Sequence, residues 1–407
     1  MKKIFRILAI VLVLAMMPMS LVACNKDDGN KPTEGLTEVK ETLKETQKQT
    51  QKNTAKPTDK KTDKPQTGDV VINLARDWDK IKLLGRSTLS NDGVICDHSA
   101  SGIEFRGTMK GDVVLEMVTA GVKNGCNTTY FTVYVDGERQ PERLEVNAGE
   151  NVLKIASFDD DAEHTIRFVK QTESNYTLCE IKTISFTSGS LATPPEDKEL
   201  FIEVIGDSLT CGMGNVGTNS SPDPQTPAWE DATQSYGYIL ADKLGADYSI
   251  VSESGIGIAG SWFDPLFDFY TKASYSRDKE QDHVFSLRTP DVIIINLGTN
   301  DFYLNKDKDP KMCTPEAVTE KTKEFINLVR DSYGENVPII WAYDFVGNCM
   351  YDSVKEAVDK LGGESAGIYF CKLPQNTGGA QWHPDVSGHQ AAADTLFPLV
   401  KKLLGIE

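Results

Sequence analysis

Residues 200–210 read Leu-Phe-Ile-Glu-Val-Ile-Gly-Asp-Ser-Leu-Thr, an apolar run that ends in a turn. Such a run fits a strand buried on both faces, as strands of parallel sheets are. Four similar runs follow, at residues 248–252, 291–297, 337–343 and 367–371, and helical patterns lie between or after them at residues 234–244, 315–332, 353–361 and 387–404. Strands that alternate with helices predict a doubly wound α/β/α domain over residues 191–407, with its site at the carboxyl ends of the strands.

The residues before this domain follow a different pattern. Short β-rich runs with turns between them occupy residues 102–107, 112–117, 130–135, 152–156, 164–169 and 178–186. Many short strands without helical patterns predict a β-sandwich, jelly-roll-like domain over residues 69–190. Pro194-Pro195 within residues 188–199 indicates a hinge after it. Two roles stay open for this domain: a packing partner without a ligand, or a glycan-binding module.

The first 68 residues have the composition of export and tethering segments. Residues 1–24 begin with basic residues, continue with an apolar run and end in Leu-Val-Ala-Cys24. This is the order of a secretory signal peptide, and its last four residues resemble a bacterial lipobox, in which the cysteine becomes the lipid attachment point. An ordinary signal peptide with an incidental Cys24 is the alternative. Residues 25–68 are polar and contain no aromatic residue, so we expect a disordered tether.

These segments predict where the protein works and what it meets. We expect a secreted, lipid-anchored protein on the extracellular face of a bacterial membrane, which the protein contacts through its N-terminal anchor alone. No later segment is long and apolar enough to span a bilayer. The net charge of −17 would repel phosphate backbones, so nucleic acid is not an expected partner. The first 68 residues are net basic, so the folded part is more acidic still and suits an uncharged substrate.

Cysteines and histidines give no metal pattern. With Cys24 lipidated, seven of the eight cysteines remain, an odd number without a CxxC spacing, so we expect most to be buried small hydrophobic residues. His98, His164 and His283 lack companions for a metal site. His389 falls within the last helical pattern and is interpreted as a packing residue. We therefore expect no metal and no cofactor.

Ser208 stands directly after the first strand of the second domain, where a nucleophile could lie. A hydroxyl is a weak nucleophile until a base removes its proton, and nearby backbone amides can hold the negative charge on an attacked carbonyl. A serine that caps a helix is the alternative. Three further blocks reach the same edge of the sheet: Glu-Ser-Gly255-Ile-Gly after the second strand, Gly-Thr-Asn300-Asp after the third, and Trp-His383-Pro before the last helix.

These four blocks, in this order, resemble the serine, glycine, asparagine, histidine hydrolases, the SGNH or GDSL superfamily. The resemblance implies that Ser208 attacks an ester and that His383 acts first as general base and then as general acid. It also implies an oxyanion hole formed by the N–H groups of Ser208 and Gly255 and by the side-chain amide of Asn300. Gly255 permits close approach of backbone to substrate, and Asn300 offers a neutral donor.

The block before His383 departs from the common pattern, in which an aspartate lies three residues earlier. Ala380 occupies that position. The second ring nitrogen still needs a partner, which is either a main-chain carbonyl near Gln381 and Trp382 or a carboxylate from elsewhere; Asp385 is poorly placed by sequence. We favour a Ser–His dyad. This omission and the preceding β domain are similar to carbohydrate esterase family two, over about residues 70–405.

Members of that family remove acetyl groups from polysaccharides such as xylan and glucomannan. The resemblance therefore implies a serine esterase that acts on acetylated polysaccharide or oligosaccharide through an acyl-enzyme. One alternative is an esterase of lipid, aryl-ester or peptidoglycan substrates, and another is a non-catalytic glycan-binding surface lipoprotein. Trp262 follows the glycine block and Trp341 lies near the end of a strand, so both are predicted to border the cleft as sugar platforms, with core positions as the alternative.

Overall fold

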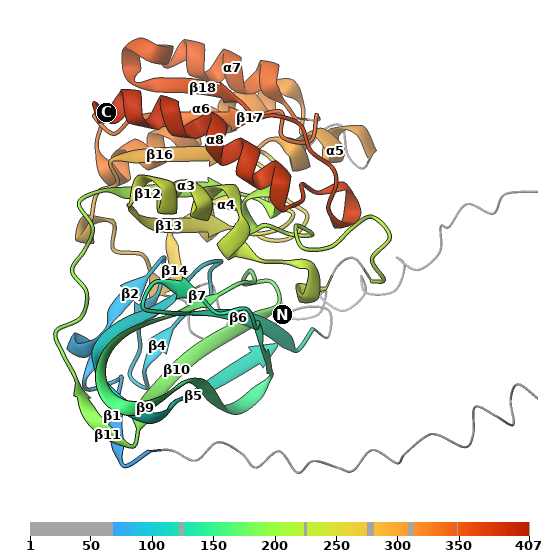
Figure 1. Cartoon of the computed structure of the whole chain (residues 1–407). Coiled ribbons are helices and arrows are strands. Elements are labelled where there is room, and N and C mark those ends of the chain that lie inside the picture. Colours follow the sequence, from blue (N-terminus) through green and yellow to red (C-terminus); the bar gives the residue numbers. More distant parts are fainter. Residues whose placement is uncertain are drawn as a thin grey trace, which may run out of the picture. The chain divides into compact units, whose positions relative to one another are not determined.

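The computed structural model describes residues 68–121, 126–223, 226–274, 281–307, 313–347 and 349–406 (Figure 1). The predicted signal peptide, Cys24 and all of the predicted tether except Gly68 lie outside these residues. Among the described helices, none combines the length and the apolar character needed to cross a membrane. The described chain forms a β domain followed by an α/β domain, which confirms the predicted two-domain fold.

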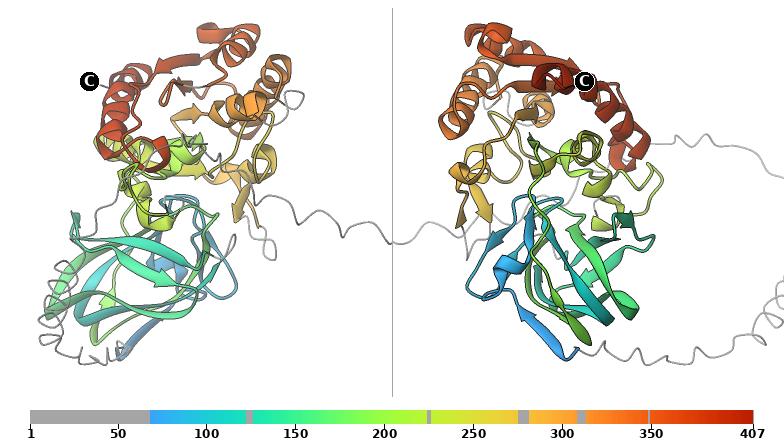
Figure 2. Two further views of the ribbon diagram at one scale, coloured as in Figure 1. Left: turned by 90° about the vertical axis from the view of Figure 1, so that its right-hand side faces the viewer. Right: turned by 60° about the vertical axis from the view of Figure 1, so that its left-hand side comes forward.

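The first domain is a curved sheet of eleven antiparallel strands. Its main path runs β3-β4-β10-β5-β9-β6-β7, and the long strands bend around the core of the domain (Figure 2). The strands are β1 (Val70–Asn73), β2 (Lys82–Leu84), β3 (Thr88–Leu89), β4 (Val94–Ile95), β5 (Gly102–Gly121), β6 (Thr128–Val135), β7 (Glu138–Arg139), β8 (Leu144–Asn147), β9 (Gly149–Lys170), β10 (Thr177–Phe186) and β11 (Ser188–Leu191).

Strands β5 and β9 each join two runs that the sequence predicted as separate strands. The pairing of β5 with β9 shifts register between Met109 and Gly111, and Gly111 has a φ of 83°. Such a bulge bends a strand without ending it. Gly111, which the sequence pattern placed in a turn between two strands, therefore lies inside one long strand. The predicted hinge, residues 188–199, is shorter than expected, because Ser188–Leu191 form strand β11, which pairs with β5.

The second domain contains a parallel sheet of five strands in the order β13-β12-β16-β17-β18, flanked by helices (Figure 1). The strands are β12 (Phe201–Gly206), β13 (Asp247–Ser252), β16 (Val292–Asn296), β17 (Ile339–Tyr343) and β18 (Ile368–Lys372). The helices are α2 (Ser208–Cys211), α3 (Tyr236–Leu244), α4 (Leu266–Tyr270), α5 (Thr299–Asp307), α6 (Pro315–Tyr333), α7 (Tyr351–Lys360) and α8 (Val386–Leu404). A small two-stranded sheet pairs β14 (Lys272–Ser274) with β15 (Gln281–Asp282).

The strand order places a switch point at β12. From β12 the chain first adds β13 on one side and later β16 on the other. Loops that leave neighbouring strands in opposite directions open a crevice at the carboxyl ends of the strands. The blocks that contain Ser208, Gly255 and Asn300 follow these three strands, so the topology brings them to one edge.

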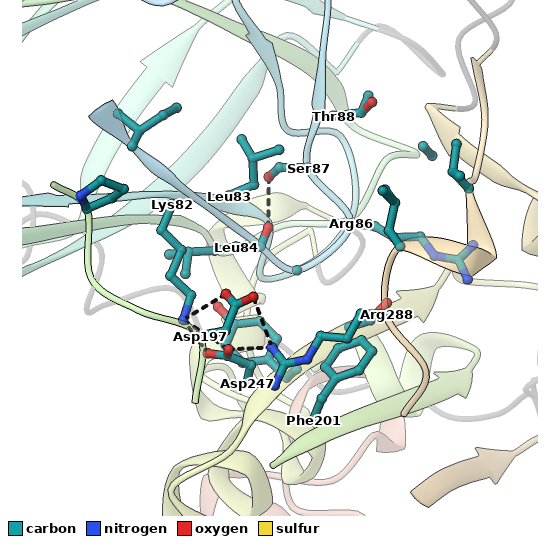
Figure 3. Close-up of a pocket in the computed structure, with 18 of the residues that line it drawn as sticks. Lys82, Leu83, Leu84, Arg86, Ser87, Thr88, Asp197, Phe201, Asp247 and Arg288 are labelled. Carbon is teal, nitrogen blue, oxygen red and sulfur yellow. Dashed lines mark hydrogen bonds and ion pairs between the residues drawn. The ribbon is translucent and has the colours of Figure 1, made fainter. Parts of the chain in front are cut away.

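Ion pairs join the β domain to the α/β domain around a cavity of about 590 Å³ (Figure 3). Lys82 Nζ on β2 lies 2.9 Å from both carboxylate oxygens of Asp247, at the start of β13. Arg288 Nη1 lies 2.6 Å from the same carboxylate, and Asp197 is within 4 Å of both cations. Farther in, Arg86 Nη2 lies 3.2 Å from Glu203 Oε2, and neither side chain is exposed. The two domains are therefore joined by buried charge as well as by apolar contact.

Seven cysteines lie in the described part of the chain, and none of them forms a disulfide with another of the seven. Five of them are buried, which agrees with their interpretation as small hydrophobic residues: Cys96, Cys179, Cys211, Cys313 and Cys371.

Candidate active site

A cavity of about 670 Å³ is lined by all four residues that the sequence singled out for chemistry: Ser208, Gly255, Asn300 and His383. They come from four separate segments, which follow β12, β13 and β16 or precede α8, and they are spread over 176 positions of the chain from the first to the last. A cavity of this size with a few convergent polar groups is the usual form of a small-molecule site. The geometry of the four residues decides what chemistry the cavity supports.

Ser208 is held on a sharp turn between β12 and the one-turn helix α2. Asp207 precedes it in extended conformation, and its Oδ1 accepts a hydrogen bond of 3.0 Å from the N–H of Leu209. This cap satisfies one amide of the turn. Ser208 is the first residue of α2, so its own N–H has no partner within the described residues.

His383 lies against the nucleophile. Its Nε2 is 2.9 Å from Ser208 Oγ, and its Nδ1 is 3.0 Å from the carbonyl oxygen of Gln381. An Nδ1–H that donates to this carbonyl leaves Nε2 as the acceptor for the serine proton. Of the two partners that the sequence left open, the structure thus shows the main-chain carbonyl. Asp385 instead caps α8, where its Oδ1 accepts from the N–H of Gly388.

The backbone before His383 is bent to make this contact. Gln381 and Trp382 have φ values of 52° and 61°, in the left-handed region that side chains other than glycine adopt at a cost. The bend is held from outside: the N–H of Ala380 donates to Gly214 O (2.9 Å), and the N–H of Trp382 donates to Asn219 Oδ1 (2.7 Å). The carbonyl of Gln381 is therefore fixed toward the imidazole.

The position that holds an aspartate in the common pattern is buried and closely packed. Ala380 is fully buried, and its Cβ would lie 3.0 Å from a Cβ added to Gly217. Gly214 faces the same residue, because a Cβ there would lie 2.5 Å from Ala380 O. Two glycines and an alanine therefore pack closely at this corner, and main chain rather than a carboxylate holds the histidine.

Gly255 presents its backbone to the cavity. Its φ of 86° suits glycine, and an added Cβ would lie 2.8 Å from the Phe263 ring. Among the described residues its N–H has no acceptor. Two unpaired amides, those of Ser208 and Gly255, therefore border the cavity in which a carbonyl would lie.

Asn300 lies in the predicted place but is already engaged. Its Nδ2 donates to Ile256 O (2.9 Å) and to Asp207 Oδ2 (3.1 Å). An amide nitrogen has two hydrogens, so both are used within the protein. The predicted role as third oxyanion donor would require one of these bonds to be shared or exchanged when substrate binds.

Two buried aspartates organise the surrounding loops. Asp301 accepts hydrogen bonds from three successive amides, those of Ile258, Ala259 and Gly260, at 2.7, 2.7 and 3.2 Å. Burial raises the pKa of Asp301 and raises the pKa of Asp207 to about 7. Asp301 holds the loop after β13 that contains Gly255, the oxyanion loop, and Asp207 holds the turn that contains Ser208, the nucleophile turn. Neither carboxylate forms a hydrogen bond with His383 within the described residues.

The two tryptophans predicted as sugar platforms differ. Trp262 is 39% exposed and lines the cavity. Trp341 is 1% exposed and lies in the core, so its prediction as a platform was wrong. Trp341 is the third of the five residues of strand β17, which runs inside the sheet between β16 and β18, so it lies in the core and not at the end of the strand. Phe263 and Trp382 are 53% and 70% exposed near the site. Neither was among the residues predicted to bind substrate.

The β domain also contributes to the cavity. Cys126, Glu173, Asn175 and Tyr176 line it. The last three belong to the loop between β9 and β10. They could not be predicted, because nothing in the sequence of a loop in one domain reveals which loop of another domain it meets. The contact shows that the β domain takes part in forming the site.

The remaining histidines do not contribute chemistry to this cavity. His389 is fully buried on α8, and its Nδ1 accepts from the N–H of Tyr236 at 3.1 Å. Burial lowers the pKa of His389 to about 3, in keeping with a neutral packing residue. Within the described part of the chain, no cluster of three or more histidines, cysteines, aspartates and glutamates has the arrangement to bind a metal ion.

Two family models match the chain. Residues 83–195 match the model for the N-terminal domain of carbohydrate esterase 2, and residues 202–396 match the model for GDSL-like lipases and acylhydrolases. The chain belongs to carbohydrate esterase family 2. Its second domain is therefore that of a carboxylic ester hydrolase.

Relatives in the family agree with this assignment. The chain is 31% identical over 339 residues to the cellulase/esterase CelE of Acetivibrio thermocellus. The matched region covers 79% of this chain but only 39% of CelE. It is 22% identical to an acetylxylan esterase / glucomannan deacetylase of Cellvibrio japonicus, over 80% of this chain and 89% of that one. A solved family two carbohydrate esterase from Clostridium thermocellum, in complex with cellohexaose, superposes with a TM-score of 0.70 at 28% identity, over 80% and 99% of the two chains.

A pH profile tests the state of the proposed base. Only neutral His383 can accept the proton of Ser208, and burial lowers the pKa of His383 below its usual 6.5, against the weaker opposite effect of the Gln381 carbonyl. We therefore expect kcat/KM on an uncharged aryl acetate to fall as pH drops, with a midpoint below 6.5. Circular dichroism at each pH provides the control for unfolding. A midpoint clearly above 6.5 would contradict the assignment.

Proposed function

We propose that this family 2 esterase removes O-acetyl groups from a neutral polysaccharide through a Ser208–His383 dyad. The observation that carries the proposal is the contact of Ser208 Oγ with His383 Nε2 at 2.9 Å, with the other ring nitrogen held by Gln381 O. A nucleophile, a base and an orienting group in this order form the general arrangement for covalent ester hydrolysis.

Acylation follows from this geometry. Ser208 Oγ attacks the acetyl carbonyl carbon while His383 Nε2 takes its proton. The carbonyl oxygen gains the negative charge and is stabilised by the N–H groups of Ser208 and Gly255. Collapse of the tetrahedral intermediate breaks the bond to the sugar oxygen, and that oxygen takes the proton from His383 Nε2. The sugar leaves with a free hydroxyl, and the acetyl group remains on Ser208.

Deacylation repeats the steps with water as nucleophile. His383 Nε2 removes a proton from a water molecule that attacks the acyl carbon, and the same two amides hold the oxyanion. Ser208 Oγ leaves with the proton from His383, and acetate is released. Each cycle consumes one ester and one water and returns both side chains to their starting states.

The lining of the cavity favours an uncharged substrate. Glu173 and Asp223 line it, and its described lining includes no lysine or arginine. Anionic substrates would meet repulsion without a compensating cation. Exposed aromatic rings at Trp262, Phe263 and Trp382 offer surfaces on which a sugar ring can lie. The relatives support a neutral polysaccharide as substrate. One is named acetylxylan esterase / glucomannan deacetylase, and another is a family two carbohydrate esterase solved in complex with cellohexaose.

An acetate-release assay tests the proposal. Purified protein would be incubated with acetylated xylan, acetylated glucomannan, acetylated peptidoglycan and an aryl acetate, and free acetate measured. We expect release from the neutral polysaccharides and the aryl acetate. Release from the aryl acetate alone would overturn the polysaccharide assignment, and no release from any substrate would favour a non-catalytic binding role.

Trp262→Ala separates substrate binding from core packing. If the ring covers a sugar face, we expect kcat/KM on polysaccharide to fall about tenfold, with activity on the aryl acetate nearly unchanged, because the small substrate has no sugar face for the ring to cover. Trp341→Ala is the control for a core position: losing a fully buried tryptophan costs about 3–5 kcal/mol, so stability should fall and both activities with it. Equal losses on both substrates in Trp262→Ala would contradict the platform.

The N-terminal segment carries a separate proposal about location. We propose that Cys24 is lipidated and that the polar residues after it tether the enzyme to the outer face of the membrane, as the lipobox-like sequence indicates. Mass spectrometry of the mature protein from its native membrane should find an N-terminal, lipid-modified Cys24. An unmodified N-terminus at another residue would overturn the proposal.

A further inference from the structure

Glu173 reaches from the β domain to the loop that forms the oxyanion hole. It lies between β9 and β10, and its side chain is 1% exposed. Its Oε2 accepts from the N–H of Ser254 at 2.5 Å, and its Oε1 accepts from Ser254 Oγ at 2.5 Å. The same carboxylate lies 3.7 Å from the thiol of Cys211, at the end of the nucleophile turn. One side chain thus contacts both elements that carry oxyanion donors.

The contacts at Ser254 fix the direction of the Gly255 amide. The carbonyl of Ser254 and the N–H of Gly255 belong to one planar trans peptide, in which the two bonds point in opposite directions. Asn175 Nδ2, which also donates to Glu173 Oε2 at 3.1 Å, lies 3.3 Å from Ser254 O. Holding this carbonyl toward the β domain turns the Gly255 N–H away from it, toward the cavity that Gly255 lines.

We propose that Glu173 is a positioning residue for the oxyanion hole, supplied to the hydrolase domain by the β domain. The proposal rests on the proposed function, because it concerns the hole that Ser208 and Gly255 form in that reaction. It gives the β domain a part in catalysis beyond packing. Glu173 touches neither the ester nor the reacting atoms and acts through Ser254 and Gly255.

A carboxylate suits this position because four hydrogen-bond donors are directed at it. The donors are the N–H and hydroxyl of Ser254, the Asn175 amide and the Cys211 thiol, while both carboxylate oxygens can only accept. A glutamine of the same shape would turn an NH₂ group toward one of these donors. The loop itself is anchored from behind, where the N–H of Glu173 donates to Glu230 Oε1 at 2.6 Å.

Glu173→Gln tests the proposal, with Glu104→Gln as its matched control. Glu104 is also a largely buried carboxylate of the β domain, but it pairs with Arg167 and does not line the cavity. Removing one oxyanion donor outright costs about 10²–10³ in kcat, so we expect Glu173→Gln to lower kcat on an aryl acetate by about 10²-fold with KM within about threefold. Glu104→Gln should change neither constant by more than about threefold.

A second readout separates positioning from simple loss of folded enzyme. A phosphonate ester that forms a tetrahedral adduct on Ser208 needs the same oxyanion hole, so its rate of reaction with Glu173→Gln should fall by the same factor as kcat. The final extent of labelling counts active sites and should stay near that of the wild type. A lower labelling extent with a normal rate would show a merely structural role and overturn the proposal.

The outcomes distinguish this proposal from the proposed function. Wild-type protein that hydrolyses no acetyl ester would defeat the proposed function. Active wild type with a Glu173→Gln variant of unchanged kcat would defeat only the role of Glu173. If Glu173→Gln does not fold, Ser254→Ala decides: it removes one of the two short contacts, so kcat should fall about fivefold at constant KM, and unchanged kcat overturns the proposal.

Discussion

Ser208→Ala and His383→Ala are each expected to lower kcat by about 10⁵-fold, and the double variant should be no worse than either single one. The two side chains act as a unit through the 2.9 Å contact, so removing one makes the other useless for proton transfer. Ser208 begins the one-turn helix α2 and His383 lies just before α8, and neither Ser208 Oγ nor the imidazole supports a neighbouring strand, so the fold should persist. Acetate release and thermal melting of the three variants, compared with wild type, measure both expectations.

Asp385→Ala is the control for a hidden triad. Asp385 is the carboxylate nearest to His383 in the sequence, yet it caps α8 and bonds to Asn376 and Ser387. Its loss should cost about 1 kcal/mol of stability as a lost cap, with kcat within about threefold. A folded Asp385→Ala variant with activity reduced about 10⁴-fold, the scale of a lost triad aspartate, would show that a carboxylate and not Gln381 O supports the histidine.

The α/β domain could be predicted closely from sequence because burial on both sides of a parallel sheet leaves a clear pattern. The apolar run that ends before Gly206 has nothing polar except Glu203, and the structure gives it strand β12. The place of the site followed from the same pattern, since blocks after neighbouring parallel strands meet at one edge. The main-chain partner of His383 was among the predicted options because Ala380 removes the usual carboxylate.

The features that sequence did not reveal depend on contacts between distant segments. The apolar run that contains Trp341 does not show where its strand ends, so the sequence is compatible with both a rim and a core position. The structure puts Trp341 in the middle of β17, inside the core. The turn-like glycine at 111 is compatible with a loop and with a bulge, and pairing with β9 selects the bulge. Glu173 becomes visible as a part of the site only once its loop lies against Ser254.

Arg86→Met is expected to give the largest loss of stability among single changes between the domains. The Arg86 side chain extends from the β domain into the α/β domain, and there it meets Glu203 on β12 at 3.2 Å with neither side chain exposed. Its other nitrogen donates to the carbonyls of Tyr270 and Lys272. Removing one member of a buried ion pair leaves the other charge uncompensated, which costs about 3–5 kcal/mol.

The free energy of unfolding, measured by urea titration, checks this expectation. The exposed pair of Lys355 and Asp359 on α7 supplies the comparison, since Lys355→Ala removes an ion pair that water already screens and should leave the urea midpoint unchanged. If the loss in Arg86→Met were only a general effect of removing an ion pair, both variants would shift alike.

A second change tests whether the uncompensated charge is the cause. Glu203 also accepts hydrogen bonds of 3.0 Å from the hydroxyls of Tyr270 and Tyr333, one at each carboxylate oxygen. Glutamine removes the charge, keeps an oxygen for one hydroxyl and can donate its NH₂ group to the oxygen of the other. Adding Glu203→Gln to Arg86→Met should therefore recover part of the lost stability, whereas two independent defects would add. A double variant less stable than Arg86→Met by the full effect of Glu203→Gln alone would show that packing, and not the buried charge, joins the domains at this point.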